Sequence, residues 1–97
     1  MAMFVGVCSM DLALYGCENL KQKRGVVRRI IRRTQDRHRI AMSEIGELDD
    51  LDSALLGIAV IGNDQSVLNG LLDRVIGFVE ELHLADVRSA DFTIEAY

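Results

Sequence analysis

Proline and tryptophan are absent from this sequence of 97 residues, and aromatic residues make up only 5 % of it. The shortage of aromatic side chains disfavours one common mode of RNA recognition, in which a sheet stacks bases on its aromatic residues. No string similar to the RNP1 motif of such sheets is present. If this protein binds RNA, we therefore expect a helix face to hold it.

Long hydrophobic runs are also missing, because no stretch reaches the roughly 18 apolar residues that span a bilayer. The segment from Ala2 to Met10 is mostly apolar, but no basic residues precede it and Asp11 interrupts it. This pattern is typical of a first strand and not of a secretory signal. We expect a cytoplasmic protein that makes no contact with a membrane.

Cysteine and histidine are scarce, and their spacing indicates neither a redox motif nor a metal site. Cys8 and Cys17 form no C-x-x-C motif, and an intracellular protein of this size keeps such thiols reduced. Cys8 is expected in the core and Cys17 in a loop, while His38 and His83 each end a predicted helix. Because no metal-ligand set, nucleophile–base pair or carboxylate dyad is apparent, we expect no cofactor, no metal and no enzymatic activity.

The composition suits one small domain over residues 1–97, with 49 % apolar and 27 % charged residues. Alternating apolar positions predict strands, and apolar positions at helical spacing predict helices. Asn19, with Gln22 returning the bond, is the expected cap of the first helix, and Asn63 or Asp64 that of the second. The expected elements are strands over 3–14, 40–45, 53–62 and 86–96, helices over 20–38 and 65–83, and an acidic loop over 46–52.

This order predicts a ferredoxin-like α+β fold, β-α-β-β-α-β, with two helices on one face of a four-stranded antiparallel sheet. Right-handed crossovers place the strands over 3–14 and 53–62 at its centre. Strict alternation along the last strand predicts that Val87 and Ser89 share one side, while Arg88 and Ala90 share the other.

Charge is distributed unevenly along the chain. Nine of the eleven basic residues lie between Lys21 and Arg39, where Asp36 is the only acid, although the net charge is −4. On a helical wheel, five of these basic residues form a stripe opposite the apolar positions. They are Lys21, Arg28, Arg29, Arg32 and Arg33. Such a stripe can track a phosphate backbone. It can equally be a solvated face that pairs with the five acids between Glu44 and Asp52, or with another copy.

Lys21, Lys23 and Arg24 fall in the first turn of the same helix. Free backbone N–H groups and basic side chains together can hold an anion. Cations at a helix N-terminus oppose the macrodipole, so we expect a bound phosphate, Glu18 or another acid to offset them. An enzyme with a small anionic substrate here is a third possibility, which a salt bridge within the protein would exclude.

The central strand over 53–62 is apolar on both sides, so we expect the sheet face away from the helices to be covered. The residues expected there are Val5, Val7, Leu55, Ala59 and Ile61. A two-fold homodimer, packed sheet to sheet or edge to edge, is the simplest cover.

Several segments recur together in one known family. They are Gly6-Val7-Cys8, Leu12-Ala13-Leu14 with Gly16, Leu20-Lys21-Gln22-Lys23-Arg24 with Val27 and Ile31, Ser43-Glu44, and ALLGIAVIGND over 54–64. In this order and spacing they resemble the YlxP-like family of small bacterial proteins of unknown function. The resemblance implies a ferredoxin-like fold and genes often found beside those for translation initiation and ribosome-binding factors. It implies no catalytic residues. Family members often carry an aromatic residue between the second and third strands, which the segment 47–52 lacks.

Together these observations favour a non-enzymatic module that binds RNA or a ribosomal subunit through a basic helix face. The residues expected to bind nucleic acid or an anion are Lys21, Lys23, Arg24, Arg28, Arg29, Arg32 and Arg33. The alternative is a homo-oligomeric protein-interaction module whose basic face is neutralised by acidic residues.

Overall fold

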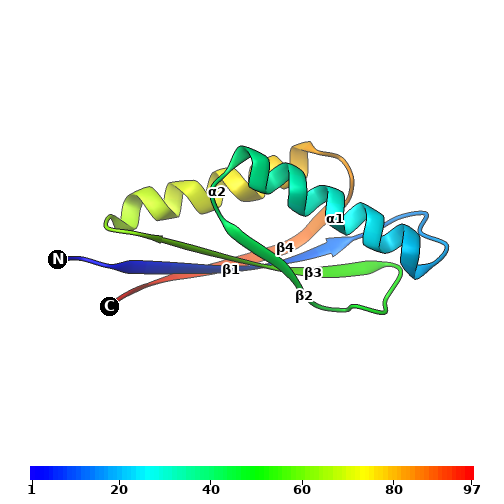
Figure 1. The fold of residues 1–97 in the computed structure, drawn as a ribbon, viewed down its shortest axis with the longest axis horizontal. Coiled ribbons are helices and arrows are strands. Elements are labelled where there is room, and N and C mark those ends of the chain that lie inside the picture. Colours follow the sequence, from blue (N-terminus) through cyan, green and yellow to red (C-terminus); the bar gives the residue numbers. More distant parts are fainter.

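The computed structural model describes residues 1–97, with four strands and two helices in the predicted order. They are β1 (Phe4–Ala13), α1 (Leu20–Arg37), β2 (Ala41–Gly46), β3 (Ser53–Gly62), α2 (Gln65–Glu81) and β4 (Asp86–Ala96). The strands form one antiparallel sheet in the order β2-β3-β1-β4, with β3 and β1 at its centre. Both helices lie on one side of this sheet (Figure 1). The predicted ferredoxin-like α+β fold is confirmed.

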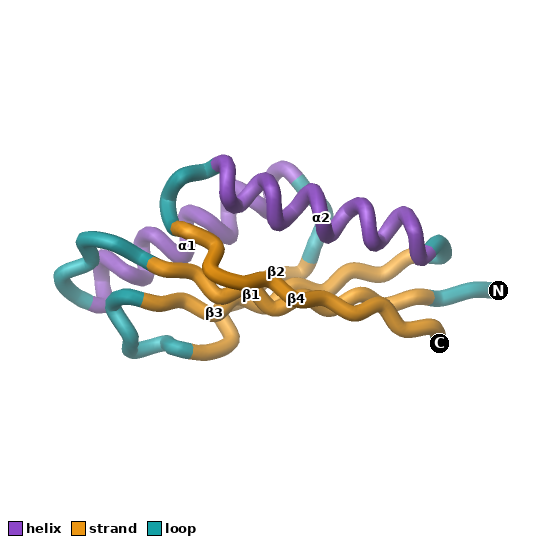
Figure 2. The backbone as a smooth tube through the Cα atoms, turned by 180° about the vertical axis from the view of Figure 1, so that it is seen from behind, coloured by secondary structure: helices purple, strands orange, loops and turns teal.

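Alternation along the central strands decides which side chains reach the core. Cys8, Met10 and Leu12 of β1 are buried, as are Leu56 and Ile58 of β3. These side chains point toward the helices and pack with the buried residues of α1 and α2. The residues between them point to the side of the sheet that both helices leave bare, which we call the uncovered face (Figure 2). No helix has both the length and the apolar character needed to cross a membrane.

Side-chain caps fix the start of both helices. The Asn19 Oδ1 accepts a hydrogen bond from the Gln22 backbone N–H at 2.9 Å. The Gln22 side chain in turn accepts one from the Glu18 N–H at 2.8 Å, one residue earlier than a standard capping box. Asp64, rather than Asn63, caps α2 and accepts from the N–H groups of Ser66 and Val67. Both starts therefore lie where polar side chains can satisfy the free N–H groups.

A bulge in β4 overturns the strict alternation predicted for that strand. Asp11 pairs with Ser89, but the next residue, Leu12, pairs with Val87, so Arg88 is the extra residue. Val87 therefore packs against the core, contrary to the prediction that it shares a side with Ser89. Arg88 instead donates hydrogen bonds to the Asp11 carboxylate at 2.8 Å and to the Ser53 hydroxyl at 2.6 Å. The bulge thus turns a cation away from the core side of the sheet.

Candidate nucleic-acid interface

The outer side of α1 carries a continuous group of arginines, which we call the arginine face: Arg28, Arg29, Arg32 and Arg33. All four side chains are exposed. Their spacing of one, three and four residues places them together over successive helical turns. The opposite side of the helix carries the buried Val27 and Ile30. The sequence pattern therefore separates an apolar stripe that packs on the sheet from a basic stripe that faces solvent.

Nothing within the protein neutralises the arginine face. The structure contains two salt bridges, Lys23 with Glu44 and Arg88 with Asp11, and neither involves this face. The four arginines line a shallow hollow together with Gly25 and Asp36. Asp36 is thus the one acid in it, and it makes no ion pair with them. The expected pairing of the stripe with the acids between Glu44 and Asp52 is absent from the arginine face.

Lys23 corrects the predicted anion-binding set, because its side chain is completely buried, at 0 % exposure. Its Nζ lies 3.2 Å from Oε2 of Glu44 on β2 and also donates a hydrogen bond to the Glu47 carbonyl oxygen. Glu44 Oε2 itself is buried, and the Lys23 ammonium group is its charged partner. The prediction that Lys23 binds an external anion is therefore wrong. This internal salt bridge is the outcome that speaks against an enzyme with a small anionic substrate at the helix start, because it takes Lys23 out of that site.

The burial of Lys23 could have been found from helical spacing. Lys23 lies four residues before Val27 and seven before Ile30, which places it on the buried stripe of α1. An acid was expected to offset the cations at this helix start, and Glu18 was the residue named for that role. The structure places Glu44 there instead, beside Lys23. Lys23 therefore joins α1 to β2 within the protein.

Lys21 and Arg24 remain exposed in the first turn of α1. Lys21 lies seven and eleven residues before Arg28 and Arg32, so it extends the arginine face toward the start of the helix. Arg24 lies at the flank of the same surface. Of the seven residues predicted to bind an anion or nucleic acid, six are therefore exposed on α1 and Lys23 is not.

The uncovered face forms a second candidate surface. The structure places Val5, Val7, Leu55, Ala59 and Ile61 on it, paired across β1 and β3 as Val5 with Ile61 and Val7 with Ala59. Val7 is 51 % exposed and Ile61 is 67 % exposed. Two large aliphatic side chains at the centre of a sheet are therefore open to solvent.

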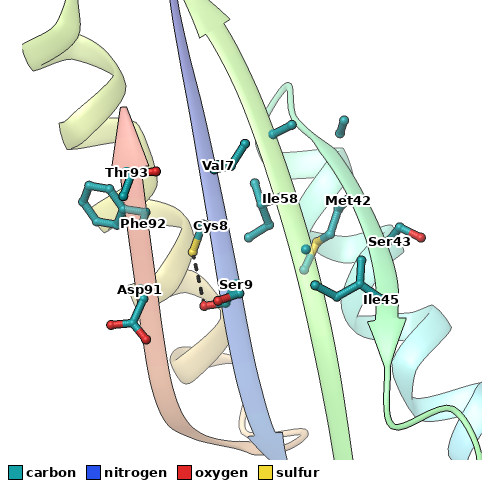
Figure 3. A pocket seen from close by; sticks show the side chains of 13 residues that line it. Val7, Cys8, Ser9, Met42, Ser43, Ile45, Ile58, Asp91, Phe92 and Thr93 are labelled. Carbon is teal, nitrogen blue, oxygen red and sulfur yellow. Dashed lines mark hydrogen bonds between the residues drawn. The ribbon is translucent and has the colours of Figure 1, made fainter. Parts of the chain in front are cut away.

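The middle of this face is hollowed, and Figure 3 shows the residues around the hollow, with both helices behind the sheet. Its rims come from β2, through Ser43 and Ile45, and from β4, through Asp91 and Thr93. Its floor includes Gly57, where an added Cβ would lie only 2.8 Å from Cγ2 of Ile45. These rim residues were not among those predicted. Alternation along 41–45 would have placed the β2 pair there, whereas the β4 pair depends on the register of that strand.

Cys8, Cys17 and His38 lie in environments that suit a structural role rather than a reactive one. Burial, and secondarily the charge of Asp91, raises the pKa of the Cys8 thiol, which disfavours the reactive thiolate. Cys17 is partly buried against the core. The His38 ring meets the Phe78 ring edge to face, with centroids 5.5 Å apart. Burial and the neighbouring Arg37 and Arg74 lower the pKa of His38 below its usual value.

Comparison with known proteins confirms the resemblance seen in the sequence. Residues 5–92 match the family described as "Protein of unknown function (DUF503)". The uncharacterized protein YlxP of Bacillus subtilis (strain 168) is 30 % identical over 76 residues, which cover 78 % of this chain and 83 % of that protein.

Two solved structures of designed proteins share the fold. LFR1 1, a de novo designed protein with a ferredoxin fold, matches with a TM-score of 0.53 and 17 % identity, over 96 % of this chain and 83 % of its own. Foldit4, also designed de novo, matches with a TM-score of 0.51 and 8 % identity, over 98 % and 96 % of the two chains. At these identities the likeness concerns the fold alone.

Proposed function

Because the chain belongs to the DUF503 family, whose function is unknown, we propose its function from its surface: a non-enzymatic module that binds RNA through the arginine face of α1. The observation that carries the proposal is that four exposed arginines stand together on one helix without a single ion pair. Concentrated positive charge on an acidic protein requires a reason, since like charges repel one another when no partner is present. A phosphate backbone supplies that partner.

The chemistry of the guanidinium group suits phosphate. Each group is always charged and offers several N–H donors in one plane, which match phosphate oxygens two at a time. Every phosphate that is neutralised releases counterions, so the affinity falls steeply as salt rises. Gly25 has no side chain and lies within the hollow beside Arg28 and Arg32. It leaves room for a backbone to approach the helix between the arginines.

RNA recognition through the arginine face is favoured over recognition through the sheet. The strand residues on the uncovered face include no aromatic side chain, because Phe4 and Phe92 both point toward the core side. Tyr97, which follows β4 and donates a hydrogen bond to Glu95, is the single exposed ring beside this face. Aromatic sheets that bind RNA stack two or three bases, so one ring at the end of a strand is a poor platform for base stacking. Contacts made only by α1 read the backbone and not the bases, so we expect little dependence on sequence. We propose a ribosomal subunit as the partner, because the family resemblance implies genes that often lie beside those for ribosome-binding factors.

The test is binding to purified ribosomal subunits and to protein-free ribosomal RNA across a salt series. Wild type is compared with Arg28→Ala/Arg32→Ala and with Arg74→Glu on α2, which lowers the net charge by the same two units away from the arginine face. We expect the first variant to lose affinity and to reduce the salt slope by about 1.4, at about 0.7 for each lost single-strand contact. The second variant should bind nearly as wild type does.

The opposite result is also informative. Equal losses in the two variants would show that net charge, and not the arginine face, controls binding. Absence of binding by wild type at low salt would refute the RNA proposal. Circular dichroism on all three proteins establishes that each is folded, because the exchanged side chains are exposed and bear no packing role.

A further inference from the structure

The uncovered face of the sheet is an apolar surface that the fold leaves without a partner. Both helices lie on the other side (Figure 2), and Val7, Ile61 and Ile45 are each more than half exposed, at 51 %, 67 % and 56 %. A contiguous exposed apolar patch on a small domain marks a contact surface. The distribution of charge on this face indicates which partner covers it.

The register of the strands arranges the face in rows that run from β4, through β1 and β3, to β2. Three of these rows are Asp91-Ser9-Gly57-Ser43, Thr93-Val7-Ala59-Ala41 and Glu95-Val5-Ile61, the last ending near Arg39. A fourth row, Ser89-Asp11-Leu55, carries the salt bridge of Asp11 with Arg88. Arg39 lies two residues before Ala41 and lines a hollow with Val5, Ala59 and Ile61. Beyond the Arg88–Asp11 salt bridge, the β4 edge of the face is therefore acidic at Asp91 and Glu95, its centre is apolar, and its β2 edge carries the Ser43 hydroxyl and the Arg39 cation.

We propose that a second copy of this chain covers the face, related by a two-fold axis that runs parallel to the strands between β1 and β3. This rotation exchanges the two edges of the sheet while keeping each row at its own level. The β4 edge of one copy then lies over the β2 edge of the other. Val5 and Val7 of each copy face Ile61 and Ala59 of its partner across the axis.

This axis gives the charged and polar rim residues complementary partners. Glu95 of one copy faces Arg39 of the other, and Asp91 faces the Ser43 hydroxyl, each twice by symmetry. Within one copy Arg39 makes no ion pair, and Glu95 accepts only the Tyr97 hydroxyl at 3.1 Å. A two-fold axis perpendicular to the strands would instead place β4 over β4, with the acids of both copies together. Charge complementarity therefore selects the parallel axis.

The size of the face is adequate for such a contact. Three strands of about ten residues rise about 33 Å, the six-residue β2 rises about 20 Å, and strands lie about 4.8 Å apart, so the flat area is roughly 570 Å². Two such faces together bury roughly 1,100 Å², which exceeds the roughly 1,000 Å² that a specific interface needs, although it is below the standard size. In the resulting sandwich the helices lie outside, so the two arginine faces point outward and remain free to bind RNA.

Sedimentation equilibrium of the nuclease-treated full chain tests the proposal. We expect wild type to dimerise and Val7→Glu to be monomeric with an unchanged circular dichroism spectrum, because Val7 is half exposed and lies near the axis. A wild type that stays monomeric at its highest soluble concentration overturns the proposal. So does a Val7→Glu protein that dimerises as wild type does, since another surface would then hold the dimer.

Charge exchange tests the axis itself. Arg39→Glu and Glu95→Arg should each weaken dimerisation by about tenfold, because each variant turns two attractive contacts into repulsive ones. The double variant Arg39→Glu/Glu95→Arg should restore it, whereas Arg74→Glu on α2 should have no effect. Failure of the double variant to recover, with both single variants weakened, overturns the parallel axis. RNA binding by Val7→Glu separates this result from the fate of the arginine face.

Discussion

Removing the buried ammonium group of Lys23 should destabilise the protein more than any change on the arginine face. Lys23 is fully buried and its Nζ lies 3.2 Å from the Glu44 carboxylate. At an effective dielectric constant of about 20, charges at this separation attract by about 5 kcal/mol, most of which offsets the cost of removing both from water. The pair therefore adds little to the free energy of unfolding, but removing one partner leaves a buried, unpaired charge that strongly destabilises the fold.

Two single substitutions should differ in a predictable way. Lys23→Met leaves Glu44, whose side chain is 17 % exposed and can regain some water, so we expect a loss near the lower end of the range, about 3 kcal/mol. Glu44→Gln leaves a fully buried cation and should cost up to about 5 kcal/mol. The double variant Lys23→Met/Glu44→Gln should recover much of this loss, because neither charge then remains unpaired.

Urea unfolding followed by circular dichroism measures these differences, because the chain has no tryptophan to report by fluorescence. A loss of about 3 kcal/mol lowers Tm by roughly 12–24 °C in a domain of this size. Equal stability of Lys23→Met and wild type would refute the reasoning. So would additive losses in the double variant, because they would show that the two side chains do not depend on each other.

Further predictions concern glycines and histidines, each checked by urea or thermal unfolding. Gly6→Ala should lower the free energy of unfolding by about 1–3 kcal/mol, because the added Cβ would lie 3.0–3.1 Å from Val60 and Leu72. Gly25→Ala has open space around it and should instead raise the free energy of unfolding by about 0.5–1 kcal/mol. Equal effects of the two substitutions would contradict this expectation. His83 follows α2 at a φ of 53°, so His83→Gly should stabilise by about 0.5–1 kcal/mol, whereas no gain over His83→Ala would show that the conformation is not strained. The pKa of His38 lies below its usual value of 6.5 in the folded state, so the unfolded chain binds this proton more tightly than the folded protein does. The contribution of His38 to the free energy of unfolding is therefore complete above pH 6.5 and is lost as the pH falls below that value. His38→Gln should reduce this loss, and an unchanged pH profile would assign it to other groups.

The order of elements, the central strands and the caps could be predicted because they depend on local patterns. Alternation placed Cys8 and Met10 in the core, and helical spacing separated Val27 from the arginine face. Asn19 and Asp64 are residues that favour caps wherever a helix begins. These features need only neighbouring residues, and the structure agrees with them.

Two features depended on contacts distant in sequence. The bulge at Arg88 arises where β4 pairs with β1, and its Asp11 partner lies 77 residues away. The fate of Lys23 depends on Glu44 and Glu47, which β2 and its loop bring beside α1. A lysine on an otherwise apolar stripe is usually assigned to the surface, because burying a charge is costly unless a partner is present. Spacing alone could have shown that Lys23 lies on the buried stripe, but not which partner makes its burial possible, and Lys23 was instead predicted among the anion-binding residues.

The arginine face could be predicted from the sequence, whereas the rim of the hollow on the uncovered face could not. Exposed stripes follow from helical geometry, so the arginine face needed no knowledge of the rest of the fold. The rim of the hollow on the uncovered face combines Ser43 and Ile45 of β2 with Asp91 and Thr93 of β4, which the sheet order brings to opposite edges. Only the strand register relates the two edges to each other.

The most direct test of RNA binding by α1 is the salt dependence of the affinity of the full chain for ribosomal RNA. Wild type is measured beside Arg28→Ala/Arg29→Ala/Arg32→Ala/Arg33→Ala. If the arginine face tracks a phosphate backbone, the logarithm of the affinity of wild type falls linearly with the logarithm of salt concentration, and the slope of the variant is smaller by about 3. An unchanged slope in the variant, or no binding by wild type at low salt, would contradict a role for the arginine face in RNA binding.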